Sequence, residues 1–190
     1  MKSSNKITSL NLPMIEPLPE ETQKYFDICQ EKLGLVPNVL KAFAFDINKL
    51  NSFICMYNDL MLSEGGLSKL DREMIAVTVS SINKCFYCLT AHGAAIRQIS
   101  GDPKLGEMIA MNYKVAPLTK KQRVMLDFVK KITCESADIE EPDRQLLRDY
   151  GFNDRDIWDI ANVTAFFNMT NRLSSAVDMR PNDAYHRQNR

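Results

Sequence analysis

The chain has 190 residues, 45% of them hydrophobic, with 24 basic and 24 acidic residues and a formal net charge of zero. This length fits one domain with a sizeable core, and the balanced charge, without blocks of like charge, excludes a general attraction to nucleic acid or anionic lipid. No apolar run suits a signal peptide or reaches the roughly 18 residues of a membrane span, so we expect a soluble cytoplasmic protein that binds neither nucleic acid nor membrane.

Helical spacing of apolar residues dominates the chain after an N-terminal arm. Residues 1–18 carry isolated apolar residues and prolines and are expected to be extended. Beyond them, prolines, glycines and capping residues separate nine apolar-periodic segments. The predicted helices cover residues 19–33, 37–45, 47–63, 68–83, 85–99, 103–111, 119–132, 142–150 and 153–179. No alternating strand pattern appears, so we predict an all-α domain at 19–180 and a tail at 181–190.

The fourth predicted helix is the least certain in type. Its interior, residues 75–82, is rich in Val, Thr and Ile, which favour strands. Ser68, however, stands three residues before Asp71, an acidic variant of the capping box that begins helices. No partner strand is visible nearby. We therefore predict a helix, followed by a short joint at Asn83-Lys84.

Two of the five cysteines form a close pair. Cys29, Cys55 and Cys134 are scattered through helical patterns and are expected to behave as small buried hydrophobes, not as a disulfide framework. Cys85 and Cys88 are separated by only two residues, a spacing typical of redox or metal chemistry.

A histidine and an acid accompany this pair at fixed spacing. His92, one of only two histidines in the chain, follows Cys88 by four positions, and Glu73 precedes Cys85 by twelve. On a helix, Cys85, Cys88 and His92 fall within a stripe roughly 60° wide, with His92 nearest Cys88. We expect the imidazole to make Cys88 the more acidic thiol, with Glu73 orienting or charging the ring.

Three chemical interpretations of the pair remain open on the residues alone. Zinc would need a fourth ligand from Cys29, Cys55, Cys134 or His186, and no second close-spaced ligand pair exists. Reduced core cysteines are common in proteins. Redox catalysis uses a low-pKa thiolate and a resolving thiol one turn away, and the neighbouring histidine and acid favour it.

The pattern Glu73-x11-Cys85-x2-Cys88-x3-His92 resembles the active-site motif of the alkylhydroperoxidase D-like proteins, within the carboxymuconolactone decarboxylase superfamily. Further segments are similar to the branch called peroxidase-related, and the resemblance covers roughly residues 20–180. These segments are Leu118-Thr119-x-x-Gln122-Arg123, Gly151-Phe152 and Phe167-Asn168-x-x-Asn171-Arg172. In the best-studied branch a histidine also lies between the two cysteines, whereas here Phe86-Tyr87 occupy that gap.

The resemblance implies an all-helical fold built from a pseudo-repeated helical unit and assembled into homo-oligomers such as trimers or hexamers. It is consistent with a faint internal repeat, in which Asp154-Arg155-Asp156 precedes Asn168-x-x-Asn171 as Asp71-Arg72-Glu73 precedes the cysteine pair. It implies catalysis without metal or organic cofactor, in which Cys88 attacks a peroxide, Cys85 resolves it to a disulfide, and Glu73 with His92 moves the proton.

The leading prediction is thus a thiol-dependent peroxidase whose disulfide is reduced by a dithiol, a thioredoxin-like protein or a lipoyl protein. Two alternatives stay open: a thiol-disulfide oxidoreductase that does not use peroxide, and a non-enzymatic helical oligomer in which the thiols act as a redox sensor. Decarboxylation, the namesake activity of the superfamily, is disfavoured because those members do not rely on this thiol pair.

Overall fold

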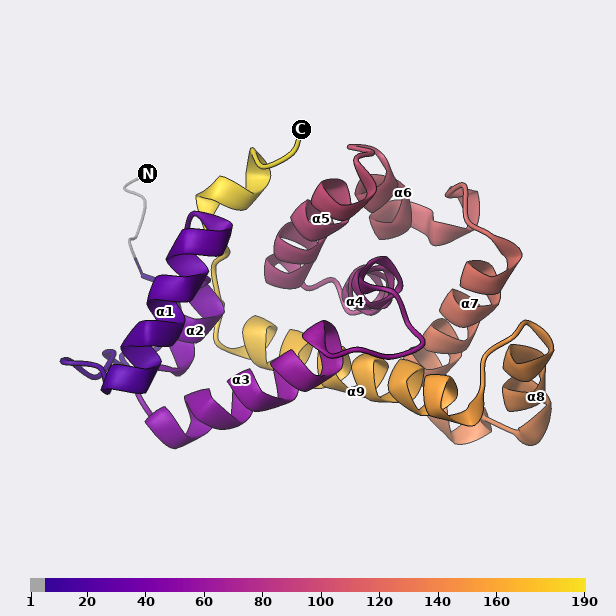
Figure 1. Ribbon diagram of the computed structural model, residues 1–190, viewed down its shortest axis with the longest axis horizontal. Helices are drawn as coiled ribbons and strands as arrows, with labels where there is room; N and C mark the ends of the chain where they lie inside the picture. The colour runs from indigo at the N-terminus through magenta and orange to yellow at the C-terminus, as the bar shows by residue number, and fades with distance from the viewer. Residues whose placement is uncertain (1–5) are drawn as a thin grey trace.

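Helix boundaries in the computed structural model, which describes residues 6–190, follow the caps and turns of the sequence (Figure 1). Nine α-helices and three 3₁₀ helices form within this range, and no strand occurs among these residues, so the all-α class is confirmed. The α-helices α1 to α9 span Glu20–Leu33, Asn38–Phe43, Ile47–Leu62, Lys69–Ile82, Phe86–Ser100, Leu105–Asn112, Lys120–Cys134, Glu141–Asp149 and Asp154–Ala176. The 3₁₀ helices η1, η2 and η3 span Tyr113–Val115, Ser136–Asp138 and Asp183–His186.

The predicted ends of the chain differ in detail from the structure. The last long helix ends at Ala176, three residues before the predicted Met179. Residues 181–190, predicted to be a tail, contain η3. Of the predicted N-terminal arm, residues 1–5 lie outside the described part of the chain.

Side-chain caps explain where α4 and α7 begin. The Ser68 hydroxyl accepts the Asp71 N–H at 3.1 Å, and the Asp71 carboxylate accepts the Ser68 N–H at 3.2 Å. Thr119 and Gln122 make the same reciprocal pair at the start of α7. These bonds satisfy N–H groups that have no partner inside the helix, so the predicted capping box is confirmed.

α4 lies at the centre of the fold. Figure 1 shows it nearly end-on, with α5, α6, α7 and α9 arranged around it. Every residue from Arg72 to Ser80 is buried. A helix surrounded on all sides needs an apolar residue at almost every position, which explains why its interior also resembles a buried strand. Packing therefore overrides the strand propensity of its Val, Thr and Ile residues.

A smaller layer of α1, α2 and α3 packs beside this central bundle and has its own core, which includes Phe26, Leu40 and Leu50. Two backbone hydrogen bonds join the described part of the N-terminal arm to the chain after α9. Ser9 donates its N–H to the Val177 carbonyl at 2.9 Å, and Arg180 donates to Ile7 at 2.8 Å. No helix within residues 6–190 is long and apolar enough to cross a membrane.

Candidate active site

The joint between α4 and α5 places Cys85 at a helix start. Lys84 adopts a left-handed conformation, with φ of 57°, and Cys85 follows as the N-cap of α5. The Cys85 N–H donates to the Ser80 carbonyl at 3.0 Å, which ties the cap back to the end of α4. The first N–H groups of α5 therefore point toward the Cys85 sulfur, where they stabilise negative charge.

Hydrogen bonds within the pair separate the two thiols in acidity. The Cys88 thiol donates a hydrogen bond to the Cys85 sulfur. The backbone N–H groups of Cys88 and Tyr87 and the Ser175 side chain donate further hydrogen bonds to the same sulfur. Together they lower the pKa of Cys85 to about 6 against the opposing effect of burial. The bond to Cys85 and burial raise the pKa of Cys88 well above its ordinary value. The pair thus holds one thiolate, at Cys85, and one proton, at Cys88.

The expectation that Cys88 is the more acidic thiol is therefore wrong. It required a hydrogen bond or ion pair from His92 to Cys88, and none forms among the described residues. The Nδ1 atom of His92 is held by Glu73 instead. The N–H groups at the start of α5 and the Cys88 thiol donate hydrogen bonds to the Cys85 sulfur. These bonds make Cys85 the more acidic of the two thiols.

Glu73 and His92 form a buried pair between α4 and α5. The His92 Nδ1 atom lies 2.6 Å from a Glu73 carboxylate oxygen, and the side chains are only 12% and 10% exposed. A carboxylate at Nδ1 fixes the tautomer in which Nδ1 carries the proton and leaves Nε2 as a base. The ring also meets the edge of Phe167, with centroids 4.7 Å apart, so its orientation is fixed by packing as well.

The four predicted site residues thus form two pairs, Cys85 with Cys88 and Glu73 with His92. Both pairs meet on α5, where His92 stands one turn beyond Cys88. A base one helical turn from a protonated thiol can receive that proton through a water molecule. Among residues 6–190, no group of three or more His, Cys, Asp or Glu side chains is arranged so that it could hold a metal ion.

The thiols are covered by parts of the chain that the sequence did not connect with them. Cys85 and Cys88 are 1% and 4% exposed, and Met179 is buried against them. The N-terminal layer closes the same site, since the Val39 N–H at the start of α2 donates to the Tyr87 hydroxyl at 2.8 Å. Val39 also packs on the thiol cluster. Tyr87, one of the two residues between the cysteines, thus anchors α2 over the thiols. It does not supply the base that a histidine would supply in this gap.

Two asparagines hold this cover together. The Asn38 N–H donates to the Asn182 side-chain oxygen at 2.8 Å, and the Asn182 amide donates to the Val36 carbonyl at 3.0 Å. The Asn38 amide in turn donates to the Arg180 carbonyl at 3.0 Å. These bonds span more than 140 positions of sequence, and nothing in the local pattern could have predicted them.

A network of amide side chains from α9 supports the joint from the opposite side. The Asn171 amide donates to the Ser80 hydroxyl at 3.0 Å, and the Asn83 amide donates to the oxygens of Asn171 and Asn168 at 3.1 and 3.0 Å. Asn171 is fully buried, and its hydrogen bond to Cys88 acts to lower the pKa of that thiol. The Asn168-x-x-Asn171 spacing drew attention in the sequence, and the structure places it behind the cysteine pair.

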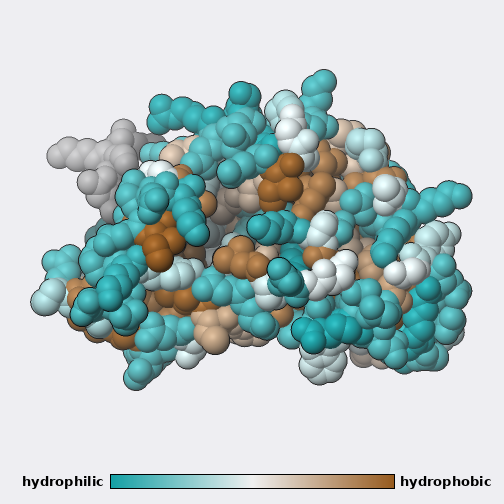
Figure 2. Space-filling model, viewed as in Figure 1, coloured by the Kyte–Doolittle hydropathy of each residue, from teal (hydrophilic) through white to brown (hydrophobic). Residues whose placement is uncertain are grey.

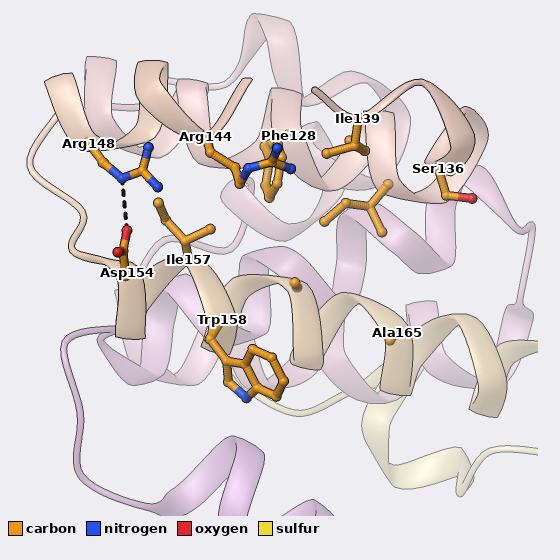
Figure 3. Close-up of a pocket in the computed structure, with 11 residues that line it drawn as sticks. Phe128, Ser136, Ile139, Arg144, Arg148, Asp154, Ile157, Trp158 and Ala165 are labelled. Atoms are coloured by element: carbon orange, nitrogen blue, oxygen red, sulfur yellow. Dashed lines mark hydrogen bonds and ion pairs between the residues drawn. The ribbon is translucent and has the colours of Figure 1, made fainter. Parts of the chain in front are cut away.

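The surface of residues 6–190 includes two hollows that differ in their distance from the thiols along the chain. One, of about 750 Å³, is lined by Phe86, His186 and parts of the arm and the C-terminal segment, and the two rings lie 5.8 Å apart. It therefore adjoins the residue that follows Cys85. The other, of about 550 Å³, lies between α7, α8 and α9, where Arg148 pairs with Asp154 (Figure 3). None of the four predicted site residues lines the second hollow.

Comparison with known proteins identifies relatives of this fold. The sequence model of the carboxymuconolactone decarboxylase family matches residues 50–112. A peroxidase-related protein from Silicibacter sp. TM1040 is 70% identical over all of both chains, with a TM-score of 0.97. A second peroxidase-related protein, from Ralstonia eutropha JMP134 and described as an alkylhydroperoxidase AhpD core, is 38% identical over 98% of both chains, with a TM-score of 0.94.

A more distant structure shares the fold only. The debrominase Bmp8, in a variant form solved in complex with 2,3,4-tribromopyrrole, is 16% identical, with a TM-score of 0.77 over 98% of this chain and 96% of its own. None of the curated proteins compared with the chain matches it significantly. On its sequence match and its full-length relatives, the chain belongs to the carboxymuconolactone decarboxylase family, in its alkylhydroperoxidase D-like, peroxidase-related group.

Proposed function

We propose that this protein is a thiol peroxidase that reduces hydroperoxides through a disulfide between Cys85 and Cys88. The observation that carries the proposal is the packing of the Cys85 and Cys88 side chains in one buried cluster at the start of α5, where hydrogen bonding to Cys88 lowers the pKa of Cys85 to about 6. A thiolate is the nucleophile in peroxide reduction, and a thiol beside it resolves the product. The peroxidase-related relatives and the buried Glu73–His92 pair support the same chemistry.

In the proposed reaction the Cys85 thiolate attacks the terminal oxygen of the hydroperoxide. The O–O bond breaks, Cys85 becomes a sulfenic acid, and the alkoxide leaves and takes up a proton to become an alcohol. His92, oriented by Glu73, then accepts the Cys88 proton through water. The Cys88 thiolate attacks the sulfenic sulfur, which forms the disulfide, and the hydroxide that leaves takes the proton back from His92 to become water. These roles exchange the two cysteines relative to the roles that the family resemblance implies.

The cycle needs an external reductant, which we propose to be a dithiol, either small, lipoyl-bound or on a thioredoxin-like protein. One of its thiolates attacks the Cys85–Cys88 disulfide and its second thiol releases the reduced enzyme. Phe86, the residue that follows Cys85, lines the hollow that also contains His186. We propose that the reductant reaches the disulfide through this hollow. We further propose that the working enzyme is a homo-oligomer in the cytoplasm.

Peroxide consumption with dithiothreitol or dihydrolipoamide as reductant tests the proposal. Turnover by the wild type should be lost in Cys85→Ser and Cys88→Ser but kept in a variant with Cys29, Cys55 and Cys134 replaced by Ser. Dimedone should trap a sulfenic acid at Cys85 in Cys88→Ser. A wild type that reduces a model disulfide but no peroxide would instead identify a thiol-disulfide oxidoreductase. A sulfenic acid trapped only at Cys88 would restore the opposite roles.

A further inference from the structure

The sulfur atoms of the thiol pair are closed off from solvent in this structure. Cys85 and Cys88 are 1% and 4% exposed, and neither of them lines the hollow of about 750 Å³ that Phe86 lines. A molecule that reacts with the Cys85 thiolate must touch its sulfur. The site therefore needs a group that can move aside.

Met179 is the part of the cover that adjoins the hollow. Its side chain is 6% exposed and packs in one cluster with both cysteines. The residues on either side of it in sequence, Asp178 and Arg180, line the hollow. Met179 thus separates the hollow from the thiols. Because a methionine side chain is unbranched and flexible, it can change its position without a movement of the backbone.

The cap of α9 fixes the backbone of Met179. Asp178 adopts a left-handed conformation, with φ of 51°, and the Met179 N–H donates to the Ser174 carbonyl at 2.8 Å. Such an arrangement is common at helix C-termini. The side chain of Met179 is consequently the part that can move.

The other part of the cover, Val39 on α2, is anchored more firmly. Its N–H is bound by the Tyr87 hydroxyl, and its neighbour Leu40 belongs to the core of the N-terminal layer. The chain that follows Met179 has no comparable anchor, because Pro181 is the only buried residue in the range 180–190. Segments with few buried apolar contacts open locally at a low cost in free energy.

Hydrogen bonds hold this C-terminal segment, residues 180–190, which we call the strap. Figure 1 shows it in yellow, passing between the N-terminal layer and α5. Close to Met179, the Asn182 side chain binds the backbone of Val36 and Asn38 at the start of α2. The two bonds of Asn182 thus keep the strap against the same helix that carries Val39.

Arg97 holds the other end of the strap to α5. Its guanidinium donates to the carbonyls of Tyr185 and Gln188 at 2.7 and 3.1 Å. Arg97 is 5% exposed and forms no ion pair within residues 6–190. The helix that begins at the thiol pair therefore also holds the strap, through a buried charge bound to strap carbonyls.

We propose that Met179 is the gate residue of the thiol site and that the strap controls it. When the strap detaches from α2 and α5, the Met179 side chain swings from the thiols into the hollow, which then opens onto the Cys85 sulfur. The open form admits the reacting molecule, and the closed form shields the thiolate between reactions. The inference goes beyond the proposed function, since it holds for any molecule that the thiols reduce.

The test measures access to the Cys85 sulfur without any peroxide. N-ethylmaleimide labelling at about pH 8 is followed at Cys85 by peptide mass spectrometry, in the background with the exposed Cys55 and Cys134 replaced by Ser. Met179→Ala removes the gate and should raise the labelling rate about tenfold or more. Met179→Leu keeps an apolar side chain of similar size and should leave the rate within about twofold of the parent.

Variants of the strap contacts should act in the same direction. Asn182→Ala and Arg97→Gln should each raise the labelling rate by about threefold to tenfold, because each removes two hydrogen bonds that keep the strap closed. Arg123→Gln is the matched control. Its guanidinium also donates to two backbone carbonyls, those of Lys114 and Ala116, but makes no contact with the strap. Its labelling rate should stay within about twofold of the parent.

Hydrogen exchange followed by mass spectrometry separates opening of the gate from unfolding of the chain. Faster labelling in the Met179→Ala, Asn182→Ala and Arg97→Gln variants, with unchanged exchange in α4, supports the gate. Labelling within twofold of the parent in all three variants overturns it. Faster labelling accompanied by faster exchange in α4 also overturns it, because access would then come from unfolding of the core. Neither readout depends on peroxidase activity, so the gate and the proposed function can fail separately.

Discussion

Glu73 on α4 and His92 on α5 lie nineteen residues apart in sequence and 2.6 Å apart in the structure. Their contact joins the central helix to the helix that begins at the thiol pair. Both side chains are buried, so the carboxylate interacts with the ring without competition from bulk water. The arrangement is suited to holding one tautomer of His92 and stabilising its protonated form when it accepts a proton.

Glu73→Gln keeps the size of the side chain but removes its charge. We expect peroxidase kcat/KM to fall roughly 10²-fold, because an amide cannot stabilise the protonated imidazole and can favour the wrong tautomer. Steady-state kinetics measures the loss, and Glu107→Gln, at an exposed site on α6, is the control. Activity within twofold of the wild type would show that Glu73 has only a packing role.

The acidity of Cys85 predicts a specific pH profile for its alkylation. In a background with the exposed Cys55 and Cys134 replaced by Ser, iodoacetamide labelling should rise with pH and reach half its maximum near pH 6. The rate should fall below that pH as the thiolate is protonated. Cys88→Ala removes the main donor to the thiolate, so the midpoint should move to higher pH. A parent midpoint near pH 9 would contradict the hydrogen-bonding scheme.

The sequence predicted the helices well because their signals are local. The capping pair Ser68–Asp71, the apolar periodicity and the break at Gly34, where φ is 72°, all act within a few residues. The order of acidity within the cysteine pair was not predictable in the same way. It depends on the left-handed joint at Lys84 and on where His92 finds its partner, which only the packing of α5 against α4 determines.

The surroundings of the thiols show the same limit. The motif identified four residues of the candidate site, but Val39, Met179 and Asn38, which cover the thiols or hold their cover in place, carried no local signal. They reach the site through contacts between distant segments, such as the hydrogen bond between Asn38 and Asn182. The internal repeat suggested by Asn168-x-x-Asn171 stays a prediction, although both asparagines support the joint before Cys85.

Asn171→Leu tests the amide network behind the thiols. The substitution keeps a similar volume but removes the acceptor for Asn83 and the donor to Ser80, so we expect a loss of about 1–3 kcal/mol in the free energy of unfolding. Urea denaturation measures it. Asn162→Leu is the control, because Asn162 lies on the same helix and makes no hydrogen bond through its side chain within residues 6–190. Equal stability of Asn171→Leu and the wild type would mean that the network contributes nothing to the fold.

Exposed apolar residues on α9 lead to a prediction about assembly. Of the large aromatic residues on α9, Phe166 and Phe167 are buried in the core of this chain and are not available for assembly. Trp158 is 68% exposed and projects away from Arg144 and Arg148 (Figure 3). On the face shown in Figure 2, hydrophobic groups are separated by hydrophilic ones, so no single large patch dominates that face.

Met169 and Leu173 are also exposed, and they lie one turn apart on α9. We expect this strip with Trp158 to pack against a second copy of the chain, since apolar strips on a helix are commonly covered in oligomers. Met169→Glu with Leu173→Glu should reduce the mass measured by light scattering at micromolar concentration from that of a trimer or hexamer toward that of a monomer. Glu31→Lys, an exposed change on α1, should leave the mass unchanged. A wild type that is already monomeric would rule out the oligomer, and an oligomer unaffected by both glutamates would place its interface on another face.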